Sequence, residues 1–134
     1  MNTISITIVT PNGIVYEGDV HMISVRATAG DMGILPDHIP VVAPLKISAV
    51  NLKHNGAEEY VAVSGGFIEV RRGSVVTIIT EAAEKQEDID IERAQRAKES
   101  AQEKLSGLSE SMAESIEAEK GLQRAENRLR VASL

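Results

Sequence analysis

Alternation of apolar and polar residues dominates the first 80 residues of the chain. In TISITIVT, residues 3–10, Ile4, Ile6 and Ile8 alternate with hydroxyl residues, which is the pattern of a strand with one buried face. Similar stretches follow, separated by turn residues: GIVYEGDV, HMISVRATAG, LKISAVNLK, EEYVAVS and SVVTIIT. Short strands at such spacing predict a sandwich or a barrel.

Turn residues mark the ends of these strands. Pro11-Asn12-Gly13 and His54-Asn55-Gly56 predict tight turns, because asparagine and glycine adopt the backbone angles that such turns need. Three prolines lie between the third and fourth of these stretches, at positions 36, 40 and 44. Proline donates no hydrogen bond to a β-ladder, so this segment is predicted to be a loop or a sheet edge.

The pattern changes after Thr80 to Ala, Glu, Lys, Gln and Arg, which favour helices. We predict one helix from Ile91 to about Leu105, a turn over residues 106–111 and a second helix from Met112 to about Val131. Each helix carries a narrow, alanine-rich seam of apolar residues at steps of three and four, at positions 94, 97, 101 and 105 and at positions 118, 122, 125, 129 and 132. Alanine seams bury little apolar area, so this hairpin is expected to be marginally stable and movable.

The predicted fold is therefore α+β, with a β-sheet domain over residues 1–86 and a helical hairpin over residues 87–134. Charge supports the division. Residues 1–88 hold 11 acidic and 6 basic residues, a net charge of −5, whereas residues 89–134 hold 9 and 8, a net charge of −1. The second helix places Lys120, Arg124 and Arg128 on one stripe, which is either a solvated face or a binding surface.

Composition excludes several classes of protein. Cysteine is absent, which removes disulfides and thiolate-bound metals and fits a reducing compartment. No secretory signal or bilayer-spanning run is present, so association with a membrane is expected only through partners. A net charge of −6 and 2% aromatic residues argue against nucleic-acid binding.

Catalytic motifs are also missing. Ser64-Gly65-Gly66 lies between strands and lacks the nucleophile elbow, so a tight hairpin is predicted there. Gly30 and Gly33 are predicted to be turn glycines with positive φ, because no phosphate-loop lysine follows them. Three histidines, His21, His38 and His54, have no metal-ligand spacing.

The stretch EDIDIERAQRAKES, residues 87–100, has the features of a helix start. Asp90 is predicted to cap the helix, with Ile89 and Ala94 packed together as a hydrophobic staple. These rules leave Arg93 unexplained, because a cation in the first turn opposes the helix dipole. A ligand site at this position remains open beside the purely structural interpretation.

The residues together resemble a known family. GDMGILPDHIPVVAPL at 30–45, SGGFIEV at 64–70 and the terminal RAENRLRVA closely resemble the epsilon subunit of bacterial F-type ATP synthases over the whole chain. The resemblance implies a β-sandwich of about ten strands and a C-terminal two-helix hairpin, in a non-catalytic rotor subunit at the cytoplasmic face of the cell membrane. Its implied partners are the gamma subunit, the ring of c subunits, and the alpha and beta subunits.

Site residues follow from the same resemblance. The loop 30–40 would contact the c ring, with Asp31 and His38 as its polar contacts. IDIERA matches the segment by which some bacterial members bind ATP as a regulatory ligand, with no cofactor required. The implied ATP-binding residues are Glu84, Ile89, Asp90, Arg93, Ala94, Arg124 and Arg128. Related ATP-binding members carry another arginine where this chain has Ser100, and a requirement for Mg²⁺ stays open.

Two functional hypotheses result. In the first, ATP favours a folded hairpin, whereas an extended hairpin presents Lys120, Arg124, Arg128 and Arg130 to the catalytic subunits and inhibits ATP hydrolysis. In the second, the hairpin is an inhibitory rotor arm without nucleotide sensing, and IDIERA is only a capped helix start. A hydrolase is the weakest alternative, since no base, nucleophile or metal cluster supports it.

Overall fold

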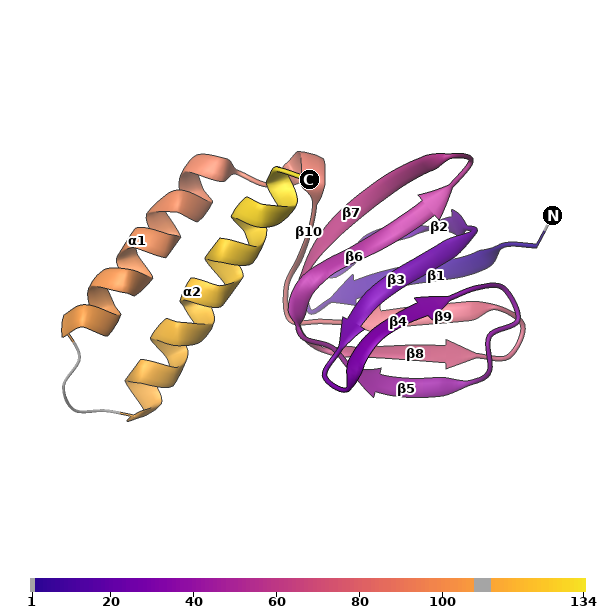
Figure 1. The fold of residues 1–134 in the computed structure, drawn as a ribbon, viewed down its shortest axis with the longest axis horizontal. Coiled ribbons are helices and arrows are strands. Elements are labelled where there is room, and N and C mark those ends of the chain that lie inside the picture. The colour runs from indigo at the N-terminus through magenta and orange to yellow at the C-terminus, as the bar shows by residue number, and fades with distance from the viewer. Residues whose placement is uncertain (1, 108–111) are drawn as a thin grey trace. The chain divides into compact units, whose positions relative to one another are not determined.

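A computed structural model describes residues 2–107 and 112–134 of the chain (Figure 1). The chain divides into two compact units, Met1–Gln86 and Glu87–Leu134. The first unit holds ten strands, and the second holds two helices. The residues 108–111 of the predicted interhelical turn lie outside the described residues, whereas Ser106 and Gly107 belong to the first helix.

The strands form two five-stranded sheets. One sheet has the order β2-β1-β9-β8-β5 and the other the order β10-β7-β6-β3-β4. The strand bounds are β1 Ile4–Thr10, β2 Gly13–Val20, β3 Met22–Ala27, β4 Gly30–Ile34, β5 Val41–Pro44, β6 Ile47–His54, β7 Ala57–Ser64, β8 Phe67–Arg71, β9 Val75–Ile79 and β10 Ala83–Lys85. The predicted α+β fold with a sandwich of about ten strands is thus confirmed.

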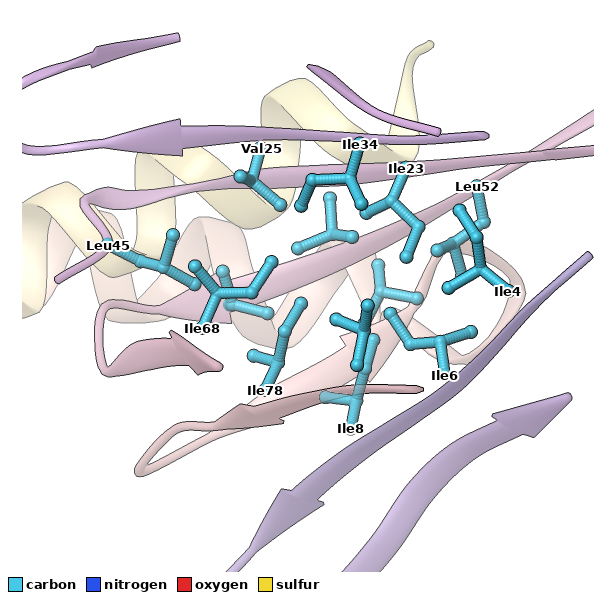
Figure 2. Close-up of a cluster of buried hydrophobic side chains, with 14 of the residues drawn as sticks. Ile4, Ile6, Ile8, Ile23, Val25, Ile34, Leu45, Leu52, Ile68 and Ile78 are labelled. Atoms are coloured by element: carbon cyan, nitrogen blue, oxygen red, sulfur yellow. The ribbon is translucent and has the colours of Figure 1, made fainter. Parts of the chain in front are cut away.

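Alternation decides which side chains fill the sandwich. Ile4, Ile6 and Ile8 on β1 are fully buried, and they meet residues of both sheets in one aliphatic core (Figure 2). All members of this core belong to the sandwich unit. Branched aliphatic side chains suit such a half-buried, pleated surface.

Two turn predictions are confirmed. Pro11 and Asn12 join β1 to β2, and Asn55-Gly56 joins β6 to β7 with positive φ at both residues. The proline-rich segment is also as predicted, since β5 is an edge strand that ends at Pro44. An edge strand has no neighbour on one side, so a proline there can lack its N–H without breaking a hydrogen bond of the sheet.

Two glycine predictions are wrong. Ser64-Gly65-Gly66 does not form a hairpin, because β7 and β8 belong to different sheets and the glycines carry the chain from one sheet to the other. Gly30 has positive φ as predicted, but Gly33 lies inside β4 without it. A Cβ at Gly33 would approach the Met22 side chain to 3.2 Å, so its glycine serves close packing.

The helical unit begins with a short 3₁₀ helix, Gln86–Asp88, that spans the boundary between the units. Helix α1 covers Ile91–Gly107 and α2 covers Met112–Ala132. Both begin where predicted, and both run one to two residues further than predicted, which is the usual uncertainty of helix ends. In the described part of the chain, neither helix is long and apolar enough to cross a membrane.

Candidate functional site

The start of α1 is capped as predicted. The backbone N–H of Arg93 donates to Oδ1 of Asp90 at 3.0 Å, and the N–H of Ala94 donates to the Asp90 carbonyl at 2.9 Å. Ile89 and Ala94 are both buried, as the staple requires. The Arg93 side chain is exposed. The backbone of this segment is therefore explained by capping, which leaves the guanidinium of Arg93 available to a ligand.

The seam between the helices consists of small residues. Ala94 and Ala101 of α1 and Ala118 and Ala125 of α2 are buried, whereas the leucines of the predicted seam are only half-buried. The two helices pack side by side as an antiparallel hairpin (Figure 1). Burial of these four alanines removes little apolar area from water, and Val131 of α2 is also fully buried. The small side chains of the seam agree with the sequence, whereas the marginal stability expected of the hairpin stays a prediction.

An open groove of about 860 Å³ runs between α1 and α2. It is wide because its walls are small: Ala97, Ser100 and Ala101 face it from α1, and Ala118 and Gly121 from α2. Its charged lining residues are Lys104, Glu114, Glu117, Arg124 and Arg128. The groove therefore offers both apolar surface and cations, which suits an organic anion.

The structure brings some of the predicted ATP-binding residues together. Arg124 and Arg128 line the groove. Because the helices are antiparallel, the first turn of α1, with Arg93, lies at the same end of the hairpin as these arginines. Arg93 itself is not among the residues that line the groove. Guanidiniums such as those of Arg124 and Arg128 can donate charge-assisted, bidentate hydrogen bonds to phosphate oxygens.

Other predicted residues lie apart from the groove. Glu84 is on β10 in the sandwich unit, and the groove lining includes neither Glu84 nor the capping segment of Ile89 and Asp90. Lys120 is exposed on α2. Arg130 lies on a different face of the helix from Arg128 and donates to Oδ1 of the buried Asn127 at 2.7 Å. Arg130 therefore lies off the stripe that the spacing predicts for Lys120, Arg124 and Arg128.

Sequence reasoning missed part of the groove. Ala97, Ser100, Lys104 and Gly107 recur on α1 at steps of three and four, which places them on one face. That spacing could have identified Lys104 as a neighbour of Ser100. The same spacing could not have shown how far Lys104 lies from Arg124 and Arg128, because that distance depends on how the two helices pack.

The two residues predicted to contact a c ring lie at opposite ends of one strand. Asp31 is at the start of β4, where Nε of Arg26 lies 3.7 Å from its Oδ1. His38 lies in the loop beyond the end of β4, where its Nδ1 is 2.7 Å from the carbonyl oxygen of Ile39. The loop is tied to the β8–β9 turn, since the Asp37 N–H donates to Oγ of Ser74 at 2.8 Å. It also exposes two large apolar side chains, Leu35 and Ile39.

A second apolar surface lies on the outer face of the β2-β1-β9-β8-β5 sheet. Val42 of β5, Phe67 of β8 and Ile79 of β9 are 64%, 55% and 56% exposed. Phe67 pairs directly with Ile79 and on its other side with Pro44, so Ile79, Phe67 and Pro44 form an apolar row across three strands. Val42 lies two residues before Pro44 on β5, opposite Glu69. Exposed apolar patches of this kind mark protein interfaces. The sequence did not reveal the row, because its members come from three separate strands.

A polar cluster joins the two sheets at the edge formed by β2 and β10. The Tyr16 hydroxyl donates to Oε2 of Glu59 at 2.7 Å, and Nε2 of His54 lies 2.8 Å from the same oxygen. The Lys85 ammonium lies 5.8 Å from the centre of the Tyr16 ring. Burial and the hydrogen bond to Glu59 raise the pKa of Tyr16, while hydrogen bonds from Tyr16 and His54 lower the pKa of Glu59.

Metal binding finds no support among the described residues. His21 and His54 both line a small hollow with Glu58. No group of three or more histidine or carboxylate side chains in the described ranges is placed to hold a metal ion.

Comparison with known proteins covers both units. Residues 3–86 match the family model "ATP synthase, Delta/Epsilon chain, beta-sandwich domain", and residues 87–133 match "ATP synthase, Delta/Epsilon chain, long alpha-helix domain". The ATP synthase epsilon chains of Bacillus pumilus and Bacillus velezensis are 54% and 55% identical over 132 residues, which cover 98% of this chain and of each relative.

A solved structure agrees. A chain in the cryo-EM structure of the Euglena gracilis mitochondrial ATP synthase, OSCP/F1/c-ring in rotational state 1, matches with a TM-score of 0.81 at 29% identity, over 100% of this chain and 83% of that one. The two matched domains together span nearly the whole sequence, and the chain belongs to the ATP synthase delta/epsilon family, among the epsilon chains.

Proposed function

We propose that this protein is a non-catalytic subunit of the central stalk of an F-type ATP synthase. The observation that carries the proposal is the agreement of both units, the sandwich and the hairpin, with epsilon chains over almost the full length. In this role it couples the c ring to the gamma subunit as part of the rotor. It is peripheral, at the cytoplasmic face of the cell membrane, and reaches the membrane only through the complex.

The apolar row of Pro44, Phe67 and Ile79, with the exposed Val42 beside it on β5, is proposed to dock the gamma subunit. The large apolar side chains of Val42, Phe67 and Ile79 are each more than half exposed. A partner that covers them removes apolar surface from water, which favours binding. The proposed c-ring contact is the segment 30–40, which the structure divides into strand β4 and the loop that follows it. Asp31 near the start of β4 and His38 in the loop are the proposed polar contacts with the ring.

Assembly tests the gamma contact. The double variant Phe67→Ser/Ile79→Ser should bind gamma at least about tenfold more weakly, because aromatic and aliphatic anchors carry most of an interface's free energy. Both side chains point outward, so the sandwich core stays intact. Ile14→Ser is the matched control, since Ile14 is similarly exposed, at 59%, on β2. Equal binding by the double variant and wild type would remove the row from the interface.

The hairpin is proposed to act as a regulatory arm. With a seam of small residues, its packing is weak enough for a ligand to decide its state. A ligand that binds only the folded hairpin stabilises it by about 2.7 kcal/mol at a hundred times Kd. ATP is the proposed ligand, with Arg93, Arg124 and Arg128 around the phosphates and Glu84, Ile89, Asp90 and Ala94 as further contacts. The extended arm then presents Lys120, Arg124, Arg128 and Arg130 to the alpha and beta subunits.

Titration calorimetry with ATP tests the sensor. Wild type should release heat on binding, and Arg93→Ala should bind at least about tenfold more weakly, because a charge-assisted hydrogen bond contributes roughly 1.5–3 kcal/mol. Arg96→Ala, which removes the same charge from an exposed position of α1, should bind like wild type. Parallel titrations with and without Mg²⁺ determine whether the ion takes part.

Ser100 provides the converse experiment. It lines the groove with Arg124 and Arg128, so Ser100→Arg adds a guanidinium where the phosphates are proposed to lie. The variant should bind ATP about tenfold or more tightly. Weaker binding by Ser100→Arg than by wild type would place the nucleotide elsewhere.

The alternative is an inhibitory rotor arm without nucleotide sensing. It is favoured by the capping geometry, which explains Ile89, Asp90 and Ala94 without any ligand. No heat with millimolar ATP, together with inhibition of hydrolysis by the intact chain, would establish this alternative.

A further inference from the structure

Strand β10 is a weakly held element. It has only three residues, Ala83–Lys85, and it pairs on one side only, with residues 61–63 of β7. A backbone hydrogen bond contributes only about 1 kcal/mol net, so this short ladder alone holds β10 weakly. At its start the Ser64 N–H donates to the Ala82 carbonyl and Ala83 packs on the sandwich core, whereas Lys85 at its end is not among the described residues that pack on the core. The chain continues from β10 directly into the 3₁₀ helix Gln86–Asp88 and the helical unit. Strand β10 is therefore the first strand of the sandwich to bear any force that the hairpin exerts along the chain.

The end of β10 has a second attachment, made by side chains. The Lys85 ammonium lies 5.8 Å from the centre of the Tyr16 ring, which is within the range of a cation–π contact. Tyr16 belongs to β2, the edge strand of the opposite sheet. The contact therefore ties β10 to a sheet with which it shares no ladder.

The Tyr16 ring is itself held in place. Its hydroxyl donates to Glu59 on β7, and Glu59 also bonds His54 at the end of β6. The ring is half-buried and packs against the sandwich core. Lys85 thus rests on a ring that is fixed from both sheets, and its positive charge also lies near Glu59, whose pKa is lowered first by the Tyr16 hydrogen bond, then by His54 and to a smaller extent by Lys85.

We propose that Tyr16 is a latch that keeps β10 on the sandwich and so sets the point from which the helical hairpin pivots. With the latch closed, the pivot lies at Gln86–Asp88. With the latch open, Ala83–Lys85 joins the linker and adds about 10 Å of reach, at roughly 3.3 Å per extended residue. The consequence for regulation rests on the proposed movement of the hairpin, whereas the latch itself is a property of the sandwich.

Hydrogen–deuterium exchange on the full chain, without ATP or partners, tests the latch. Lys85→Met keeps the length of the side chain and removes its charge. It should raise exchange at the β10 amides about two- to fivefold, the factor that corresponds to a cation–π contact. Tyr16→Phe keeps the ring but frees it from Glu59, and it should raise exchange at the same amides. Amides of the central strand β6 should be unchanged in both variants.

Tyr60→Phe is the matched control. The Tyr60 hydroxyl also donates to a carboxylate, that of Glu58, at 2.7 Å. Both residues lie on β7, so this hydrogen bond does not connect the two sheets. The variant should leave β10 unchanged. Equal amide exchange at β10 in Lys85→Met and in wild type would overturn the latch. Faster exchange in both β10 and β6 would also overturn it, because Lys85 would then contribute to the stability of the whole sandwich. Failure of ATP to bind would affect the proposed sensor and leave this result as it stands.

Discussion

At the scale of single residues, Gly66 shows how one backbone position can depend on a distant strand. Its φ is +95°, and a Cβ there would collide with the carbonyl oxygen of Ile79 and lie 2.8 Å from Cα of Thr80. Gly66→Ala therefore combines left-handed strain with a clash against backbone that cannot move freely. We expect a loss of about 3–5 kcal/mol in the free energy of unfolding, measured by urea denaturation.

Gly73→Ala separates the two causes. Gly73 also has positive φ, at +83°, but a Cβ there would meet no atom within 4 Å. Gly73→Ala should lower the free energy of unfolding by only about 1 kcal/mol, which is the cost of the left-handed backbone without a clash. Similar losses in both variants would show that the approach of Ile79 to Gly66 is unimportant.

Tyr16 predicts an alkaline limit to stability. Burial and the bond to Glu59 raise the pKa of Tyr16, so the unfolded chain, with a tyrosine pKa of about 10, loses this proton first as pH rises. The stabilisation is fully present below about pH 10 and is lost as pH rises from there toward the folded pKa. Urea denaturation between about pH 9 and pH 12 should show a falling free energy of unfolding that is less steep in Tyr16→Phe. An equal slope in both proteins would contradict the assignment.

At the scale of elements, the Asp90 cap should matter to α1, because the buried side chains of this helix are the small Ala94 and Ala101. Asp90→Ala should lower the stability of α1 by about 1 kcal/mol. The loss should appear as faster amide exchange in the first turn, where the Arg93 N–H is bonded to Asp90.

Asp90→Ser distinguishes capping from ligand binding. Serine keeps the cap but removes the carboxylate, so exchange should stay near wild type. If ATP affinity nevertheless falls in this variant, the carboxylate contributes to the nucleotide site. If Asp90→Ser speeds amide exchange in the first turn of α1 as much as Asp90→Ala does, the capping role is refuted.

At the scale of the whole molecule, the two units have separate cores. Every member of the aliphatic core belongs to the sandwich unit. Truncation after Asp88 should therefore leave a folded sandwich, with a urea midpoint close to that of the sandwich in the full chain. The truncated protein should still assemble with gamma and the c ring and should no longer inhibit ATP hydrolysis. Its failure to assemble would make the hairpin a structural part of the stalk.

Local patterns made much of this fold predictable. Alternation at Ile4, Ile6 and Ile8 identified a buried face, and the cap at Asp90 located the start of α1. Strand β10 escaped prediction, because Ala83, Glu84 and Lys85 favour a helix by propensity. They form a strand only because β7 offers an unpaired edge beside them.

Pairings and sites over long distances were beyond the reach of local pattern. Strand β1 pairs in parallel with β9, and alternation says which face of a strand is buried but not which strand lies next to it. The SGG turn was predicted as a hairpin for this reason. In the site, helix-start rules left Arg93 unexplained, and the family resemblance proposed a role for Arg93, Arg124, Arg128 and the position of Ser100. Lys104 entered only with the groove.

The division follows from the range of the interactions. Strand faces, turns, helix starts and membership of the family depend on residues close in sequence or on ordered motifs, and these are legible in the chain alone. The crossing at Gly66, the apolar row and the contacts of Tyr16 with Glu59 and Lys85 join residues far apart in the sequence. Such contacts exist only once two sheets have packed around one core, and so the tertiary structure alone decided them.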